Sequence, residues 1–342
     1  MTHKAKSVLR YLRASLLRGT GLLWLAKRRA AKHGVVVVML HRVLDEEFPR
    51  SSSLPGILVR RQTFQQFVSW AAKSFEVVDL SKGIPDWTKA ARSARIAFTF
   101  DDGWLDNYEI AAPVLFRNRT PTTIFVCPGL MGIPFPFWPE RVSYLISRLR
   151  SISDINEVFP ELSRLERSKT AEVAIERLKQ MSPEGREEYV LRLEALPRLE
   201  DSGDTEHEPL NRTMTWEQVQ GLHALGICIG SHTLSHPILT SVSEETVCRE
   251  LVESRCQIEA GLKASCGMLA YPNGNHDEMT VRAAADAGYT VAFTTQRGLW
   301  TQQTDMLHVP RVNIFEQKLI GPSGRFSRAM AEYALFWKLE SC

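Results

Sequence analysis

From residue 35 onward, the chain alternates between short apolar runs rich in β-branched residues and longer segments with helical periodicity. The first run is "VVVVML", and Phe64, Phe67, Val68 and Ala71 then follow the i, i+3, i+4, i+7 spacing of a helix. Strands that alternate with helices are typical of a parallel sheet or barrel. We therefore predict an α/β fold with roughly seven to eight strands. The predicted strands are residues 35–40, 75–79, 96–100, 122–126, 227–230, 268–271 and 290–294.

Residues 140–210 interrupt this alternation. They carry the highly charged stretches "SRLERSKTAEVAIERLKQM" and "PEGREEYVLRLEAL" and end in the acidic stretch "EDSGDTEHEP". We interpret them as helical hairpins that form an insertion or lid rather than a second catalytic domain. The predicted organisation is a basic amphipathic extension at 1–34, a barrel at 35–315 that contains this insertion, and a C-terminal helix at 316–342.

Two further patterns concern helices. Thr215 and Gln218 have the Thr-x-x-Gln pattern of a capping box, which predicts a helix that begins there and ends near Gly226. Near the C-terminus, four large residues recur at helical spacing, which favours core or dimer packing over a membrane face. These residues are Phe326, Met330, Tyr333 and Trp337.

The 42 basic and 39 acidic residues are distributed unevenly. Residues 1–34 hold nine of the basic residues and no acidic one, which leaves 33 basic against 39 acidic residues elsewhere. A mildly acidic body argues against a nucleic-acid-binding surface. In the leader, Leu9, Leu12, Leu16 and Leu23 share one face of a predicted helix, as in helices that lie on anionic membranes. We predict peripheral membrane contact there; a packed or partly disordered extension is the alternative.

The cellular location is predicted from the N-terminal leader, residues 1–34, and from the cysteines. The longest apolar run of the leader, "LLWLA", is too short for a signal peptide and is followed by positive charge. No transmembrane segment is predicted. The six cysteines are scattered without a C-x-x-C pair, which favours reduced thiols. We expect a cytoplasmic protein, at the inner membrane face if the leader binds lipid. A secreted protein with an unrecognised leader is the rival location.

The stretch "FTFDDGW" ends a predicted strand in two adjacent carboxylates, Asp101 and Asp102. Asp-Gly is also a common turn dipeptide, so this stretch alone does not indicate chemistry. A second stretch, "SHTLSH", follows another predicted strand and places His232 and His236 four residues apart. Neutral imidazoles are common ligands for zinc and similar ions, although each histidine could instead hydrogen-bond a loop.

The two stretches carry more information together than separately. In α/β barrels the carboxyl ends of the strands meet on one face, where the active site lies. Two histidines and one carboxylate would make three protein ligands and leave an open position for water or substrate. The second aspartate could then accept a proton from the attacking water.

The chain resembles the polysaccharide deacetylase family, carbohydrate esterase family four, and in particular its chitooligosaccharide-deacetylase-like domain. "TFDDG" and "SHTLSH" resemble the first two motifs of that family, and the resemblance covers about residues 35–315. It implies a distorted (β/α)7-type barrel with helical additions. It also implies that Asp101 is the catalytic base and that Asp102, His232 and His236 hold a divalent metal, zinc first, with cobalt, nickel or manganese as alternatives.

The remaining predicted site residues also rest on the resemblance. "VVVVMLHRV" is similar to a first strand whose histidine supplies the general acid, so His41 is preferred over His308 for that role. The third motif lacks its usual arginine, and Arg311 is the predicted substitute that orients the base; the alternative is that Arg311 pairs with an acid at the domain rim. Substrate contacts are predicted at Trp104, Tyr271 and Pro272, with an oxyanion-binding backbone N–H near Tyr271 or Trp104.

These residues predict a metal-dependent hydrolase of bacterial glycan biosynthesis. It would remove N-acetyl groups from hexosamine residues of a polysaccharide or lipid-linked glycan. A carbohydrate O-deacetylase is an alternative, because esters and amides pass through similar tetrahedral intermediates. A catalytically silent glycan-binding homologue is another, although all four motif positions are intact. A metallopeptidase is disfavoured because the H-E-x-x-H pattern is absent.

Overall fold

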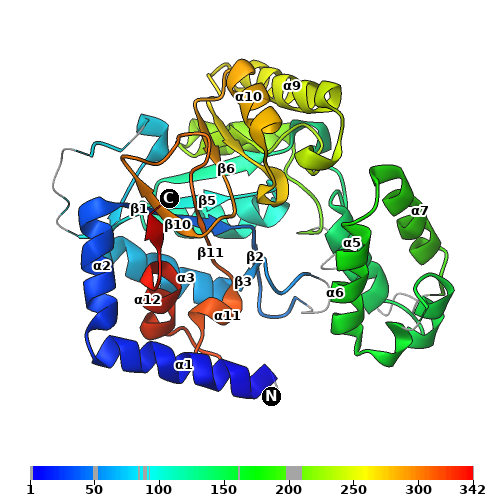
Figure 1. The fold of residues 1–342 in the computed structure, drawn as a ribbon, viewed down its shortest axis with the longest axis horizontal. Coiled ribbons are helices and arrows are strands. Elements are labelled where there is room, and N and C mark those ends of the chain that lie inside the picture. The colour runs from blue at the N-terminus through cyan, green and yellow to red at the C-terminus, as the bar shows by residue number, and fades with distance from the viewer. Residues whose placement is uncertain are drawn as a thin grey trace. The chain divides into compact units, whose positions relative to one another are not determined.

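The computed structural model describes residues 3–48, 53–83, 85–87, 91, 93–160, 162–197 and 210–341. The chain divides into two compact units (Figure 1). The first, the barrel unit, contains residues 1–46, 57–132 and 214–342, and the second, the insertion unit, contains residues 47–56 and 133–213. Each unit is described by itself.

The barrel unit is built around a mainly parallel sheet with the strand order β12-β10-β1-β5-β6-β7-β8-β9. β1 lies next to β5 in parallel, and the order then continues through β9 by parallel pairs. The strands on this path are β1 Gly34–Leu40, β5 Arg95–Phe100, β6 Thr122–Val126, β7 Cys228–Ser231, β8 Met268–Ala270, β9 Val291–Phe293, β10 Gly298–Thr301 and β12 Glu340–Ser341. The alternation in the sequence therefore correctly predicted a parallel α/β sheet.

The segment at 309–313 joins the two ends of the parallel sheet. Val309 pairs in parallel with Phe293 at the end of β9, and β11, Val312–Asn313, pairs in parallel with β1. With this segment, seven parallel strands curl into a distorted barrel, as predicted. β10 instead runs antiparallel to β1, and the short strand β4, Glu76–Val77, pairs with β5. β2, Arg42–Leu44, and β3, Leu58–Arg60, form a separate parallel pair.

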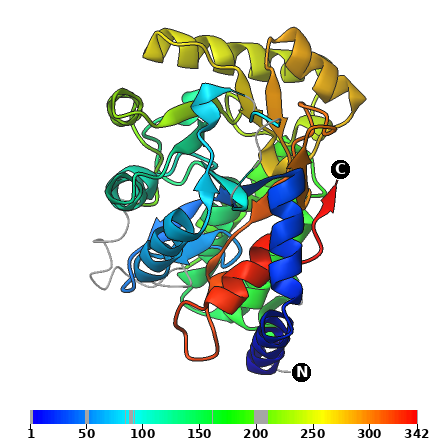
Figure 2. The same ribbon diagram turned by 90° about the vertical axis from the view of Figure 1, so that its left-hand side faces the viewer.

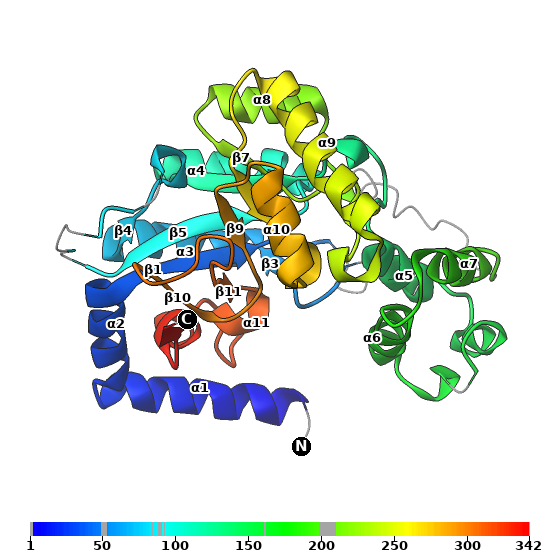
Figure 3. The ribbon, with the colours of Figure 1, turned by 45° about the horizontal axis from the view of Figure 1, so that its top comes forward.

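Helices surround the sheet (Figure 3). α8 begins with the predicted capping box, in which Thr215 and Gln218 bond each other's backbone N–H groups. β1 is buried along its whole length because both of its faces are covered. The helices of this part of the unit are α3 Arg61–Ser74, α4 Ala112–Arg117, α8 Trp216–Ala224, α9 Glu244–Leu262 and α10 Glu278–Asp286, with a π-helical turn at Asn107–Ala111.

The N-terminal extension consists of two helices, α1 His3–Gly19 and α2 Leu22–His33, which pack against α12, Arg328–Phe336 (Figures 1 and 2). Gly21 breaks the extension with a φ of +79°. Leu23 is therefore buried while Leu9, Leu12 and Leu16 are exposed, so the predicted common face of these four leucines is wrong. Within the described ranges, no helix is long and apolar enough to cross a bilayer.

The C-terminal region was predicted as one helix, which is wrong. It contains α11, Glu316–Leu319, a turn, α12 and the strand β12. Met330 is buried against Ala14 of α1, and Phe326 contacts the rings of Phe67 and Trp70. The aromatic spacing in this region therefore reflects core packing.

The insertion unit has its own apolar core, formed by α5 Trp138–Ser147, α6 Arg167–Leu178 and α7 Pro183–Glu194. It begins at residue 133 rather than 140 and includes 47–56. The reason is local, since the buried Glu140 accepts hydrogen bonds from the Ser53 hydroxyl and the Leu54 backbone N–H. The acidic loop at 200–209 lies outside the described residues, and the lid role of this unit stays a prediction.

Candidate active site

The polar side chains of the site gather where parallel strands of the barrel end. Asp101 and Asp102 follow β5, His232 follows β7, and His41 follows β1. Arg311 lies in the segment that joins the ends of the sheet, directly before β11. Carboxyl ends of parallel strands carry the active site in barrel enzymes, so this position is chemically informative.

Asp102, His232 and His236 form a cluster whose ligand atoms all lie within 4.8 Å of one another. The Oδ1 atom of Asp102 lies 3.4 Å from Nε2 of His232 and 3.5 Å from Nε2 of His236. Asp102, Thr233 and His236 have φ values of +75°, +67° and +61°. Such backbone conformations are uncommon outside glycine and concentrate at functional sites, because the surrounding structure must hold them.

The neighbours of this cluster orient its ligand atoms. Nδ1 of His232 lies 2.7 Å from the carbonyl oxygen of Ala270, which accepts its hydrogen and leaves a lone pair on Nε2. The indole N–H of Trp104 donates to Oδ2 of Asp102 at 3.0 Å, so Oδ1 faces the histidines. The buried Glu250 accepts hydrogen bonds from the Ser235 backbone N–H and hydroxyl, which holds the loop between the two histidines. One carboxylate oxygen and two imidazole nitrogens suit a zinc-like divalent ion.

The protonation states of His236 and Asp102 agree with a ligand role. Burial lowers the pKa of His232, but the contact with Asp102 and the charge of Asp101 outweigh it and raise the pKa, so His232 gives up a proton when it binds a metal. Burial lowers the pKa of His236 to about 4, with the charge of His232 in the same direction, so its imidazole is neutral. Burial by itself raises the pKa of Asp102, but the contact with His232 and the other nearby histidines outweigh it and place the pKa below its ordinary value. Metal ligands must be neutral imidazoles and ionised carboxylates, so both groups are prepared to bind.

Asp101 is held by Arg311 in a bidentate pair. The two guanidinium nitrogens lie 2.6 Å and 2.7 Å from the two carboxylate oxygens, and Arg311 is fully buried. Nε of Arg311 donates to the carbonyl oxygen of Thr294. Burial raises the pKa of Asp101, but the positive charge of Arg311 outweighs it, so the carboxylate is ionised. The alternative that Arg311 pairs with an acid at the domain rim is therefore wrong.

His41 lies next to this pair, with its Nε2 atom 3.9 Å from Oδ2 of Asp101. Its backbone carbonyl accepts a hydrogen bond from the Asn107 side chain. The buried carboxylate of Asp106 accepts from the Val43 backbone N–H and the Arg42 guanidinium, which fixes the turn after β1. Burial lowers the pKa of His41, although the carboxylates of Asp102 and Asp101 act in the opposite direction, so its imidazole is neutral in the absence of ligands.

His308, the rival general acid, has different neighbours. Its described contacts are an ion pair with Asp305 at 3.1 Å and a ring contact with His276, whose ring stacks on Tyr271. The structure therefore brings His41, rather than His308, into contact with the predicted base.

The three residues predicted to contact substrate are all buried. Trp104 holds Asp102, and the guanidinium of Arg42 covers its ring at 4.1 Å. Tyr271 and Pro272 follow β8 at the same end of the barrel. The backbone N–H of Tyr271 itself donates to the carbonyl oxygen of Phe293, and an oxyanion-binding N–H near Tyr271 or Trp104 stays a prediction. Substrate contact by these three residues stays a prediction.

Several supporting residues were not found from the sequence. They are Arg42, Thr99, Asp106, Asn107, Glu250 and Thr294. Asp106 and Asn107 lie soon after "FDDGW" and could have been noticed there. Glu250 lies on α9, 15 residues after Ser235 in the loop that it holds, and its acidic side chain resembles the exposed acids around it. A single sequence offers no signal for such a contact.

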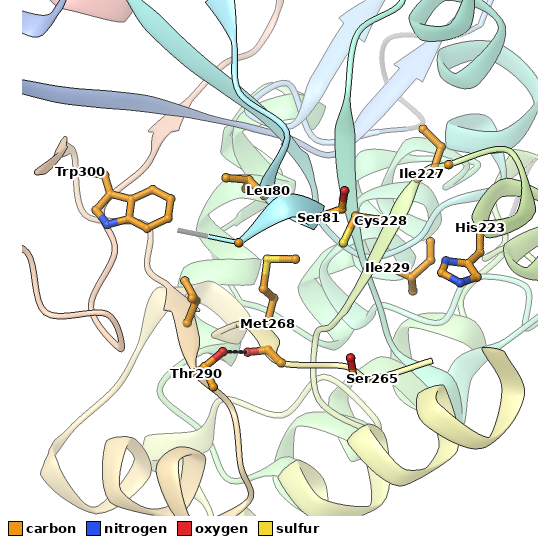
Figure 4. Close-up of a pocket in the computed structure, with 14 residues that line it drawn as sticks. Leu80, Ser81, His223, Ile227, Cys228, Ile229, Ser265, Met268, Thr290 and Trp300 are labelled. Atoms are coloured by element: carbon orange, nitrogen blue, oxygen red, sulfur yellow. Dashed lines mark hydrogen bonds between the residues drawn. The ribbon is translucent and has the colours of Figure 1, made fainter. Parts of the chain in front are cut away.

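A cavity of about 500 Å³ lies at the opposite end of the strands (Figure 4). Its wall includes Cys228, Met268 and Val291, which are the first residues of β7, β8 and β9. None of the site residues described above lines it. The cavity is therefore separate from the cluster at the carboxyl ends of the strands.

Part of the chain matches the model of a known protein family. Residues 200–292 match the model of the family described as polysaccharide deacetylase. This part of the chain is therefore similar to the polysaccharide deacetylase family. The resemblance inferred from "TFDDG" and "SHTLSH" is thereby confirmed.

One similar curated protein is "Putative polysaccharide deacetylase YxkH" of Bacillus subtilis (strain 168), which is 28% identical over 101 residues. The aligned part covers 30% of this chain and 36% of YxkH, so the chain matches about a third of that relative's length.

Solved structures share the fold over most of the chain. The Streptococcus pyogenes deacetylase PplD, in complex with acetate, has a TM-score of 0.52 at 16% identity and covers 85% of this chain and 96% of its own. IcaB from Ammonifex degensii has a TM-score of 0.52 at 17% identity, with 89% and 97% covered. The de-N-acetylase from Aggregatibacter actinomycetemcomitans has a TM-score of 0.52 at 14% identity, with 88% and 99% covered. At these identities the likeness concerns the fold, and it confirms the predicted distorted barrel.

Proposed function

We propose that this protein is a metal-dependent glycan deacetylase that hydrolyses the N-acetyl group of hexosamine residues. One observation carries the proposal. A buried, ionised carboxylate, Asp101, is held by Arg311 directly beside a three-residue ligand set at the carboxyl ends of the barrel strands. A base next to an open metal site is the arrangement that metal-assisted hydrolysis requires.

Asp102, His232 and His236 would hold the divalent ion, most simply zinc, with cobalt, nickel or manganese as alternatives. The bound ion would act as a Lewis acid toward the acetyl carbonyl and would acidify the attacking water. Asp101 accepts the proton of that water, and its pair with Arg311 keeps the carboxylate ionised and correctly oriented. Trp104 and Ala270 keep the ligand atoms of Asp102 and His232 directed at one point.

We assign proton donation to the leaving amine to His41. It lies 3.9 Å from the base, so a proton taken by Asp101 has a short path to the imidazole. Burial keeps His41 neutral before the reaction, and it can therefore accept a proton before it donates one. The products would be acetate and a free amino sugar.

The proposed substrate is a polysaccharide or lipid-linked glycan of a bacterial cell surface, acted on from the cytoplasm. One protein of similar fold, the Aggregatibacter actinomycetemcomitans enzyme, is a de-N-acetylase, which supports amide rather than ester hydrolysis. The five described cysteines are free, which is compatible with a reducing compartment. Cell fractionation that finds the protein outside the cytoplasmic membrane would contradict the proposed location.

The proposed activity is tested by incubating the zinc-loaded protein with N-acetylglucosamine oligomers and with a lipid-linked N-acetylhexosamine. We expect release of acetate together with an equal amount of new primary amine. An O-acetylated sugar serves as the comparison substrate. Acetate from the O-acetylated sugar alone would favour the O-deacetylase alternative. Glycan binding without acetate from any substrate would favour the silent binding homologue.

The general acid is tested by comparing His41→Ala with His308→Ala. We expect His41→Ala to lower the rate of acetate release by roughly 10²-fold or more, because a positioned acid contributes about that much. His308→Ala should remain within a few-fold of wild type, since the described contacts of His308 are with Asp305 and His276. Zinc content should be unchanged in both variants. The reverse order of rates would assign the acid role to His308.

A further inference from the structure

The outer face of α1 and the first turn of α2 expose an unusual number of large apolar side chains. We call these seven residues the apolar patch: Val8, Leu9, Leu12, Leu16, Leu22, Trp24 and Leu25. Their side chains are 36% to 66% exposed. Contiguous exposed apolar surface on a soluble protein commonly marks an interaction site.

The exposure does not result from loosely attached helices. The opposite face of α1 buries Ala14 against Ala329 and Met330 of α12, and α2 buries Leu23. Arg18 and Lys27, one from each helix, both pair with Glu332 of α12. Figures 1 and 2 show α12 beside both helices. The helices are therefore anchored by one face, and the apolar patch is on their exposed side.

The charged side chains that α1 and α2 themselves carry have a single sign. The first acidic residue of the chain is Asp45, so α1 and α2 contain no carboxylate side chain. Exposed cations lie on the same two helices as the apolar side chains, and the guanidinium of Arg28 lies 4.5 Å from the ring centre of the exposed Trp24. The exposed cations are Lys6, Arg10, Arg13, Arg18, Arg28, Arg29 and Lys32. Apolar residues flanked by lysine and arginine, with a tryptophan among them, are the composition of helices that lie in a membrane interface.

A hollow of about 300 Å³ adjoins the patch at Leu25. Its wall includes the apolar residues Leu25, Leu299 and Phe336, together with the cations Arg29 and Lys338. Such a hollow offers an apolar surface to a lipid chain and positive charge to a phosphate. The hollow therefore extends the apolar and cationic surface of the patch to β10 and the end of α12.

Other occupants fit less well. A second copy of the chain that used the same face would bring two acid-free, cationic surfaces together, which is unfavourable. A nucleic acid would satisfy the cations but would leave the exposed leucines without an apolar partner, since phosphate contacts dominate such binding. An anionic bilayer satisfies both, because its headgroups pair with the cations and its acyl region accepts the leucines.

We propose that α1 and α2 dock the protein on an anionic phospholipid bilayer through the apolar patch, with the surrounding cations at the headgroups. This docking is independent of the proposed deacetylase activity. Each cation near such a surface strengthens the attraction to the headgroups, and the exposed leucines add apolar burial. The docking requires no membrane-spanning helix.

The test is flotation of the full chain with vesicles of phosphatidylglycerol mixed with phosphatidylcholine, compared with phosphatidylcholine alone. We expect binding to the anionic vesicles and partial release by high salt, because salt screens the headgroup attraction. The triple variant Leu9→Ser, Leu12→Ser, Leu16→Ser should bind more than about tenfold more weakly, since these side chains lose their apolar burial. All three side chains are more than half exposed, so the fold should persist.

Leu225→Ser is the matched control. Leu225 is 67% exposed and follows α8, outside the patch, so its replacement should leave vesicle binding unchanged. Equal binding of the triple variant and wild type would overturn the proposal, as would equal binding to vesicles with and without phosphatidylglycerol. A dimer in size-exclusion chromatography that the triple variant abolishes, without vesicle binding by wild type, would assign the patch to a second copy instead. Acetate release from soluble oligomers should be the same in all variants, which separates this test from that of the proposed activity.

Discussion

Replacing Asp101 with asparagine is expected to reduce acetate release by roughly 10²- to 10⁴-fold, the usual contribution of a positioned general base. Asparagine has nearly the same shape as aspartate but cannot accept a proton from water. Initial rates on N-acetylglucosamine oligomers measure the effect. Zinc content should remain unchanged, because Asp102, His232 and His236 supply the ligand atoms. A folded Asp101→Asn protein with a rate near that of wild type would exclude Asp101 as the base.

Stability must be measured alongside this variant, because Asp101→Asn leaves the buried guanidinium of Arg311 without its carboxylate. Removing one partner of a buried ion pair typically costs about 3–5 kcal/mol. Arg311→Met is the matched control, since it breaks the same pair but keeps the base. Without Arg311, burial should raise the pKa of Asp101, so the carboxylate would ionise only at higher pH. Activity of Arg311→Met should therefore recover as pH rises, whereas activity of Asp101→Asn should not.

The second large effect is expected from His232→Ala, which should abolish both zinc binding and acetate release. His232 is buried and its Nε2 atom is directed toward Asp102 by the contact with Ala270, so alanine removes a preorganised ligand. Loss of a partner outside the ligand set already weakens metal binding about 10- to 100-fold, and loss of a ligand should exceed that range. Zinc content after dialysis, measured by mass spectrometry, and titration with zinc give the result.

The control for this variant is His33→Ala. His33 is exposed in the last turn of α2, distant in the fold from the ligand set, so its replacement should change neither zinc content nor rate. Unchanged zinc content in His232→Ala would mean that the metal is held elsewhere, and the three-residue site would have to be abandoned. Loss of acetate release with zinc retained would instead give His232 a role toward substrate.

Most of the strands could be located from periodicity because the signal is local. β6 begins and ends at the predicted residues, and β1, β5, β7, β8 and β9 each lie within one residue of prediction at either end. Buried parallel strands are continuous apolar runs, which the sequence displays directly. The antiparallel β10 and the short β11 were not predicted, because their pairing partners lie on β1, far away in the sequence.

Part of the candidate site could be predicted from the sequence for a similar reason. "FTFDDGW" and "SHTLSH" each follow a strand, and the carboxyl ends of parallel strands must meet, so proximity of Asp102 and the two histidines could be deduced. Arg311 was found by noticing a missing arginine in the third motif. The hydrogen bonds by which Glu250 and Asp106 hold the neighbouring loops could not be predicted. The sequence does not distinguish a buried acidic residue that holds a loop from an exposed one.

The sequence by itself determined the parallel α/β class, the positions of most strands along the chain and the two motifs at their ends, since each depends on neighbouring residues. The tertiary structure decided which leucines of the N-terminal helices are buried, because Gly21 redirects the chain and α12 covers one face. It also decided that Arg311 binds Asp101, because the segment at 309–313 joins β9 to β1. Pairings of this kind depend on contacts between residues hundreds of positions apart, and local periodicity carries no information about them.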